Sequence, residues 1–126
     1  MNQGPVAVLV IETGANDGLR GQDPDSVKAR IQAIIDRVRR ASPPPRIVIT
    51  GMEAMPNLGG SYVRRFRDIY PALAKTNNAA LVPFLLAGVA GVDTLNQDDG
   101  IHPTRAGQRI VAENVWRVLE PLTRRR

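Results

Sequence analysis

The chain has 126 residues, of which 43% are hydrophobic and 23% charged, and this composition indicates one globular domain over residues 1–126. It contains no cysteine, which excludes disulfides, thiolate nucleophiles and cysteine-ligated metals. The formal net charge is +5, but the basic residues are dispersed and aromatic residues make up only 4%, so we expect no nucleic-acid partner.

The sequence also bears on membranes and targeting. No apolar run approaches the roughly 20 residues that a membrane-spanning helix requires. No basic region precedes the first apolar stretch, as it would in a signal peptide. We therefore expect a soluble chain without a membrane span, which would be cytoplasmic if the sequence is complete; the sequence leaves the compartment otherwise open.

Three short apolar runs predict strands. Residues 5–11 form a continuous run of the kind found in parallel sheets that are covered on both faces. Residues 46–50 and 80–84 predict two more strands, and Pro83, which has no N–H to donate, places the last one at a sheet edge.

Apolar residues at helical spacing predict three amphipathic helices that alternate with these strands. Their core-facing stripes are Val27, Ile31, Ile34, Ile35 and Val38, then Tyr62, Phe66, Ile69, Tyr70 and Leu73, and finally Ile110, Val111, Val115, Val118, Leu119 and Leu122. The order strand, helix, strand, helix, strand, helix predicts an α/β domain with a short parallel sheet of about three strands flanked by helices.

Individual residues mark where these helices begin and end. Asp23 is the expected N-cap of the first helix, with Pro24 at its first helical position. Pro71 is expected to kink or divide the second helix, and Pro121 to close the third.

Two loops follow predicted strands at their carboxyl ends, where open α/β sheets bind ligands. The first has the sequence GANDG at residues 14–18, and the second is the Gly- and Pro-rich stretch 51–60. In the second loop, Met52 and Met55 could line an adaptable apolar pocket, although filling the core is the commoner role of methionine.

His102 is the only histidine of the chain, and Asp99 lies three residues before it. The polar, glycine-containing stretch 98–104 leads directly into the last predicted helix. Such a turn can expose an imidazole while a nearby carboxylate fixes its tautomer, which is what a general base needs. A lone histidine is also often a structural or surface residue, so the residues alone leave both interpretations open.

Four segments occur together in an order and at separations that resemble the SGNH or GDSL hydrolases. They are GANDGL at residues 14–19, MPNLGGSYVRRFRDIYPALA at 55–74, LVPF at 81–84 and DDGIHP at 98–103. The pattern is most similar to the thioesterase, lysophospholipase and arylesterase branch, and it covers nearly the whole chain. The resemblance implies a three-layer, flavodoxin-like SGNH-type fold and the hydrolysis of small acyl or aryl esters without a cofactor.

The resemblance also implies roles for individual residues. Asn16 would donate its side-chain amide to the oxyanion, His102 would act as the general base, and Asp99 would orient the imidazole. The residues expected on the substrate side are Gly14, Met52, Met55, Pro56 and Asn57. The carboxylates Glu12, Asp17, Asp98 and Asp99 show no metal-ligand spacing, so no metal site is predicted.

The serine nucleophile of the family's GDS motif has no counterpart in these residues, and neither has its second, glycine-bearing block. The serines present are Ser26, Ser42 and Ser61, and only Ser61 follows a loop at the carboxyl end of a strand. Ser61 is therefore the candidate substitute nucleophile, with a helix-start residue as the alternative. The chain could be a truncated gene product, a diverged enzyme that uses another hydroxyl or water, or a non-catalytic binding module.

The missing blocks bear on assembly as well. In the family that this chain resembles, two further strands lie beside the strand at 5–11, so their absence would leave an apolar edge. We therefore expect a homo-oligomer whose contact includes the strand from Pro5 to Ile11.

Overall fold

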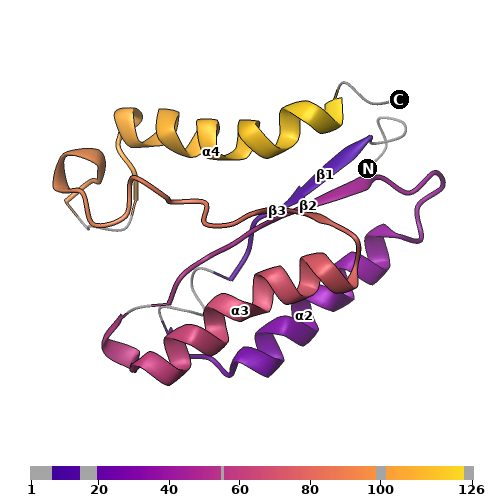
Figure 1. The fold of residues 1–126 in the computed structure, drawn as a ribbon, viewed down its shortest axis with the longest axis horizontal. Helices are drawn as coiled ribbons and strands as arrows, with labels where there is room; N and C mark the ends of the chain where they lie inside the picture. The colour runs from indigo at the N-terminus through magenta and orange to yellow at the C-terminus, as the bar shows by residue number, and fades with distance from the viewer. Residues whose placement is uncertain (1–6, 15–19, 55, 99–101, 124–126) are drawn as a thin grey trace.

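The computed structural model describes residues 7–14, 20–54, 56–98 and 102–123, and it confirms the predicted α/β architecture. Strands and helices alternate along the chain as expected (Figure 1). Their bounds are β1 Val8–Ile11, α2 Pro24–Val38, β2 Arg46–Thr50, α3 Gly60–Thr76, β3 Ala80–Val82 and α4 Arg105–Thr123, with short 3-10 turns η1 at Pro56–Leu58 and η2 at Asp93–Leu95.

The three strands form one parallel sheet in the order β1-β2-β3. Val10 lies opposite Val48 in the register of the first pair, and Val48 lies opposite Ala80 in the second. The edge position predicted for β3 is confirmed, but this strand ends at Val82 and not at residue 84. It stops just before Pro83, because proline has no N–H for the ladder.

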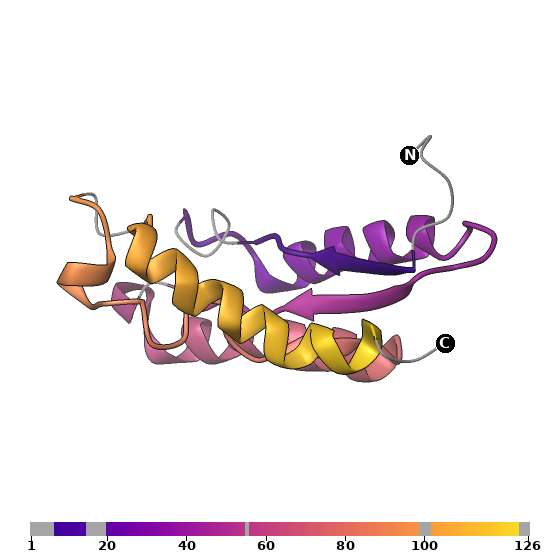
Figure 2. The same ribbon diagram turned by 90° about the horizontal axis from the view of Figure 1, so that it is seen from above.

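Helices cover the two faces of the sheet unequally. Helices α2 and α3 lie together on one face, and α4 lies on the other (Figure 1). The core between the sheet and the first two helices contains Ile11, Ile47 and Ile49 from the strands. Viewed from above, α4 runs over β2 and β3, while β1 lies beside it (Figure 2).

The covering of β1 differs from the sequence prediction. Val10 and Val48 are neighbours in register on the same face, yet Val48 is completely buried whereas Val10 is 37% exposed. The prediction that this strand is covered on both faces is therefore wrong for the face that carries Val10. The physical reason is the course of α4, which packs against β2 and β3.

Helix α2 begins where the sequence predicts, with Asp23 at the N-cap position and Pro24 in the first turn. The Asp23 side chain makes no capping bond to the backbone, and its Oδ2 atom accepts the hydroxyl of Ser26 at 3.1 Å. Ile34 was expected in the core stripe, but its side chain is 42% exposed. It lies at the margin of the stripe, whereas Ile31 and Ile35 point fully into the core.

The two internal prolines interrupt their helices less than expected. Helix α3 runs without a break through Pro71, and α4 continues past Pro121 to Thr123. Both prolines are exposed, so water can hydrogen-bond to the carbonyl groups that a proline leaves without a helical donor.

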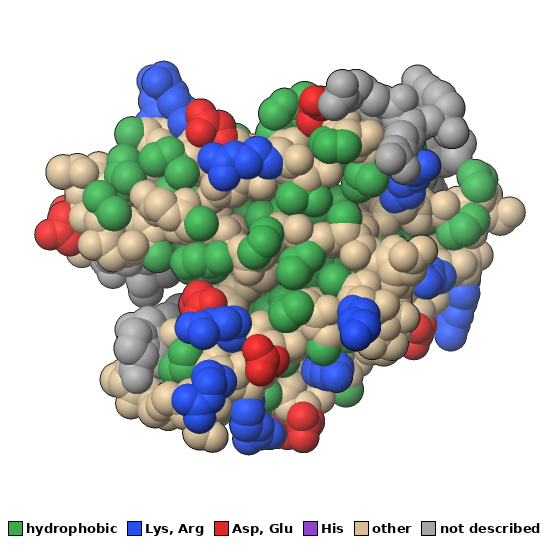
Figure 3. Space-filling view, viewed as in Figure 1, with side chains coloured by type: hydrophobic (Ala, Val, Ile, Leu, Met, Phe, Trp, Pro, Cys, Tyr) green, Lys and Arg blue, Asp and Glu red, His purple; other side chains and the backbone are tan. Residues whose placement is uncertain are grey.

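The outer surface reflects the layers. In the space-filling view, hydrophobic side chains form a band between α4 and α3, and charged side chains gather over the outer sides of α2 and α3 (Figure 3). None of the helices in the described part of the chain is both long and apolar enough to cross a membrane.

Replacing Ile35 with Ala should lower the free energy of unfolding by about 2–5 kcal/mol, because the side chain is fully buried and its removal leaves a cavity. The neighbouring Ile34→Ala variant should lose less than about 1 kcal/mol, because Ile34 is largely in solvent. Urea unfolding followed by circular dichroism measures both values. Equal losses would contradict the orientation of α2.

Candidate active site

Hydrogen bonds join the carboxyl ends of the three strands. The buried Thr50 hydroxyl donates to the carbonyl oxygen of Ile11 at 3.3 Å, which ties the end of β2 to the end of β1. On the other side, the Gly51 N–H donates to the Val82 carbonyl at 2.7 Å, and the Leu85 N–H donates to the Gly51 carbonyl at 3.0 Å. The loops that follow the strands therefore start from fixed positions along one edge of the sheet.

The chain leaves β1 through a tightly packed turn. The hydroxyl of Tyr70, whose side chain is 1% exposed, donates to the carbonyl oxygen of Thr13 at 3.1 Å. Gly14 follows with φ +102°, a conformation that side-chain-bearing residues rarely adopt. A Cβ atom on Gly14 would overlap the Tyr70 hydroxyl, so the site requires glycine for space as well as for its dihedral angle.

The loop after β2 is held against α3 by an ion pair. The Arg67 guanidinium donates from Nε to both carboxylate oxygens of Glu53, at 3.0 and 2.9 Å, and from Nη2 at 3.0 Å. The pKa of Arg67 is raised, chiefly by these hydrogen bonds and secondly by the negative charge of Glu53. Just before Glu53, Met52 packs into the core and is only 7% exposed, whereas Asn57 is exposed.

His102 forms the last described pair, with Gln97, of a narrow two-stranded stem. The Gln97 N–H donates to the His102 carbonyl at 2.7 Å, and Asn96 pairs with Pro103 in an antiparallel bridge. The Thr104 N–H donates to the Leu95 carbonyl at 2.9 Å and closes the stem. The stem fixes the backbone at His102, whose side chain is exposed.

Side-chain amides hold this region to the rest of the fold. The Asn96 amide donates to the carbonyl oxygens of Val89 and Val92 at 2.8 and 2.9 Å. Asn114, buried on α4, donates to the carbonyl oxygens of Leu85 and Ala87 at 3.0 and 2.9 Å. These four bonds satisfy carbonyl groups in the irregular segment that connects β3 to the stem.

The structure brings several of the predicted site residues to one end of the molecule. The strands run toward the end at which segment 85–104 lies, and α3 also begins there (Figures 1 and 2). Gly14, Met52, Asn57 and His102 are in segments that follow the strands at this end, and Ser61 is exposed in the first turn of α3. Asn16, Asp99 and Met55 lie outside the described residues, and so does the side chain of Pro56.

Two residues near this edge were not identified as site residues from the sequence. Tyr70 was predicted only as a core residue and Thr50 only as the end of a strand. A tyrosine within an apolar stripe is a usable signal, because a buried phenolic hydroxyl needs a hydrogen-bond partner. The partner itself, the Thr13 carbonyl, is 57 residues away in sequence and could not be inferred.

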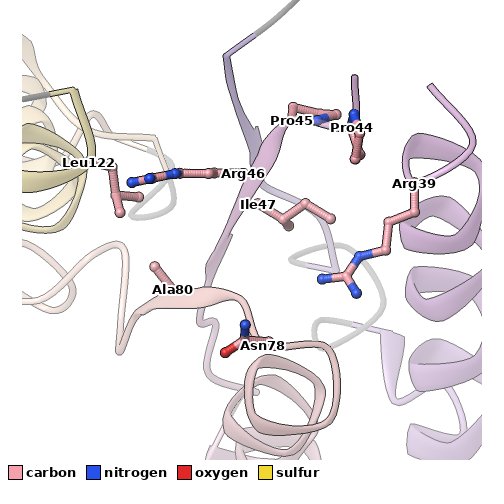
Figure 4. Close-up of a pocket in the computed structure, with 8 residues that line it drawn as sticks. All are labelled: Arg39, Pro44, Pro45, Arg46, Ile47, Asn78, Ala80 and Leu122. Carbon is pink, nitrogen blue, oxygen red and sulfur yellow. The ribbon is translucent and has the colours of Figure 1, made fainter. Parts of the chain in front are cut away.

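The described residues hold no group of three or more histidine and carboxylate side chains that could bind a metal ion. A hollow of about 650 Å³ lies at the opposite end of the sheet, beside the first residues of β2 and β3. In Figure 4, Arg39 reaches into it toward Asn78 while Arg46 points toward Leu122, so the two guanidinium groups do not converge. None of the predicted site residues lines this hollow.

The sequence matches a known family and several characterised proteins. Residues 2–110 match the GDSL-like lipase/acylhydrolase family. The chain is 40% identical to esterase TesA of Pseudomonas aeruginosa over 116 residues, which cover 92% of this chain and 57% of that protein. It is 36% identical to thioesterase 1/protease 1/lysophospholipase L1 of Escherichia coli over 90% of this chain and 54% of that protein. It is 35% identical to an arylesterase of Vibrio mimicus over 86% of this chain and 53% of that protein.

Solved structures agree with these sequence matches. The crystal structure of TesA superimposes with a TM-score of 0.84 and covers 92% of this chain and 63% of its own. The SGNH-hydrolase family esterase AlinE4, 36% identical, gives a TM-score of 0.73 over 96% of this chain and 64% of its own. The predicted SGNH-type fold is thereby confirmed, and the chain spans about half the length of the curated relatives that it matches.

Replacing Gly14 with Ala should destabilise the fold more than the same change at Gly91. Both glycines have positive φ, but only at Gly14 would the new methyl group meet another atom, the Tyr70 hydroxyl. Gly91→Ala should cost about 1–2 kcal/mol for the dihedral strain alone, and Gly14→Ala at least about 1 kcal/mol more for the overlap. Urea unfolding of the two variants gives the comparison, and equal costs would contradict the close packing at Gly14.

Proposed function

The chain belongs to the GDSL-like lipase/acylhydrolase family, and from this premise we propose that it is a carboxylic-ester hydrolase that acts on small acyl or aryl esters. The observation that carries the proposal is where two described segments of the chain lie. The turn after β1, which leads into the GAND motif, and the stem that carries His102 lie at the end of the molecule toward which the parallel strands run. Parallel α/β sheets bind their ligands at this edge.

Each proposed catalytic residue has a distinct task. His102 takes a proton from the attacking hydroxyl and returns it to the leaving alcohol, and Asp99 orients the imidazole for both steps. The side-chain amide of Asn16 donates a hydrogen bond to the oxygen that becomes negative when the ester carbonyl is attacked. We infer that Gly14, Met52, Met55, Pro56 and Asn57 form the substrate side of the site, with Met52, which packs into the core, as its buried floor.

The attacking group is either the hydroxyl of Ser61 or a water molecule. Ser61 is exposed in the first turn of α3, at the same end of the molecule as the His102 stem. Attack by serine gives an acyl-enzyme that water then hydrolyses, whereas attack by water gives acid and alcohol in one addition and elimination. In both cases His102 is the base.

A non-catalytic role is the second candidate. The same edge of the sheet would then bind a small molecule or a partner protein without turning it over. The exposed side chains of His102 and Asn57 at this edge suit binding as well as catalysis, and none of the described serines lies in a GDS sequence. The two roles differ in whether ester hydrolysis depends on His102.

We expect the purified chain to hydrolyse p-nitrophenyl acetate and butyrate, and we expect His102→Ala to lower the rate by a factor of about 10²–10⁴ because a general base is lost. Release of p-nitrophenolate, followed by absorbance, measures the rate. Gln108→Ala, an exposed change on α4, serves as a control that should retain full activity.

The Ser61→Ala variant separates the two nucleophiles. Loss of activity in this variant would identify Ser61, whereas retained activity together with loss in His102→Ala would identify water or another hydroxyl. Absence of hydrolysis above the buffer rate in the unmodified chain would contradict the catalytic proposal and favour the binding role.

We also propose that the chain forms a homo-oligomer through the strand from Pro5 to Ile11. In its described part, β1 pairs only with β2, so one edge of this strand is open. Val8–Ile11 has no charged residue and no proline, the usual features that prevent edge-to-edge pairing. Two such edges can pair about a two-fold axis.

Replacing Val10 with Lys should convert this oligomer to a monomer, because the charge would lie beside the apolar contact. Ile34→Lys is the matched control, since Ile34 is similarly exposed but lies on helix α2 and not on the strand. Sedimentation velocity at high micromolar concentration distinguishes the two states. A monomeric unmodified chain would contradict the proposal.

A further inference from the structure

The hollow at the opposite end of the sheet from the candidate active site has the size of a small-molecule site. Its volume is about 650 Å³, which lies within the range of roughly 300–1,000 Å³ that ligand pockets span. It is formed where β2 and β3 begin and where α2 and α4 end (Figure 4). Elements from both faces of the sheet therefore contribute to its walls.

Apolar side chains form the middle of the hollow. Ile47, the second residue of β2, is 4% exposed and lies between Arg39 and Arg46 in Figure 4. Ala80 and Leu122 are half-buried and add further apolar surface. A ligand with a hydrocarbon middle would remove this surface from water, which favours its binding.

The charged side chains of the hollow are cationic and lie apart. Of the described residues that line it, only Arg39 and Arg46 are charged, and neither forms an ion pair with a carboxylate in the described part of the chain. Arg39 reaches toward Asn78, whereas Arg46 points toward Leu122 (Figure 4). A small anion therefore meets one guanidinium group only, whereas a longer ligand with an anionic group at each end meets both.

The guanidinium group of Arg39 is held in place by a buried neighbour. Its Nη2 atom donates to the carbonyl oxygen of Asn77, a residue that is 7% exposed. The side chains of Asn77 and Gln32 exchange two hydrogen bonds, at 2.9 and 2.8 Å, and the Asn77 amide also donates to the Leu73 carbonyl at 2.9 Å. Because a guanidinium group has five N–H donors, Arg39 can keep this bond and still bind an anion. Holding the group in advance lowers the entropic cost of binding.

We propose that the hollow binds an aliphatic dicarboxylate, with one carboxylate on Arg39, the hydrocarbon chain over Ile47 and the second carboxylate on Arg46. Guanidinium groups suit carboxylates because their paired N–H donors match the two oxygens. Both arginines are exposed, so each ion pair contributes modestly, and we expect roughly millimolar affinity. The hollow shares no residue with the proposed ester-hydrolase site, so this inference stands apart from the proposed function.

NMR titration of the ¹⁵N-labelled full chain with adipate, suberate and sebacate, three dicarboxylates of increasing length, tests the site. The tightest of the three should shift the backbone amides of Arg39, Ile47 and Asn78. It should bind about three- to tenfold more tightly than octanoate, which has a hydrocarbon chain but only one carboxylate. The uncharged 1,8-octanediol should bind more weakly than octanoate.

Three variants of the full chain test the contacts. Arg39→Met and Arg46→Met should each weaken binding of the tightest dicarboxylate by about three- to tenfold, because each removes one ion pair. Arg37→Met is the matched control, since it removes the same charge from an exposed position of α2 outside the hollow, and it should change the affinity by less than about twofold because solvent screens its charge. If Arg39→Met fails to fold, Arg46→Met decides the question.

Three results would overturn the inference: no dicarboxylate that binds more tightly than octanoate, equal weakening in all three variants, or shifts confined to the residues around Gly14 and His102. The last result would place carboxylates at the edge where they are products of the proposed hydrolysis, and it would leave the proposed function intact. Dicarboxylate binding at the hollow of a chain that hydrolyses no ester would instead support this inference and contradict the catalytic proposal.

Discussion

Strand β2 holds the rest of the structure in place, because it lies between the other two strands and its last four residues are buried. Its parallel register with β1 and β3 directs all three carboxyl ends to one edge. The Thr50 hydroxyl and the Gly51 backbone then bond to the chain on either side, at Ile11 and Val82. The turn that leads to Asn16 and the segment that leads to His102 therefore begin at fixed positions on one edge.

The loops beyond this edge are fixed by polar contacts to helices that pack on opposite faces of the sheet. Helix α3 supplies the Tyr70 hydroxyl to Thr13 and the Arg67 guanidinium to Glu53, and α4 supplies the Asn114 amide to Leu85 and Ala87. Irregular backbone needs such partners, because an unsatisfied buried carbonyl is costly. The same contacts can keep catalytic side chains in position although these side chains lie in loops and not in strands.

The strands, the helices and the edge position of β3 could be predicted from the sequence, because apolar runs, helical periodicity and Pro83 are local signals. The exposure of Val10 could not, since it depends on where α4 crosses the sheet. Ile34 and Ile35 look alike in the sequence, and only the packing of α2 decides which of them enters the core. For the site, the motifs indicated His102 and Gly14, whereas the roles of Tyr70 and Thr50 depend on contacts between distant segments. The catalytic roles of His102, Asn16, Asp99 and Ser61 stay predictions.

In the proposed function, the GAND segment and the His102 turn meet in one ester-hydrolase site. A crystal structure that includes residues 14–19 and 98–104 measures this most directly. We expect an Asp99 carboxylate oxygen about 2.6–3.2 Å from Nδ1 of His102, with Nε2 facing the same open space as the Asn16 amide. An imidazole turned away from Asn16, or an Asp99 carboxylate beyond the reach of one bridging water, would contradict it.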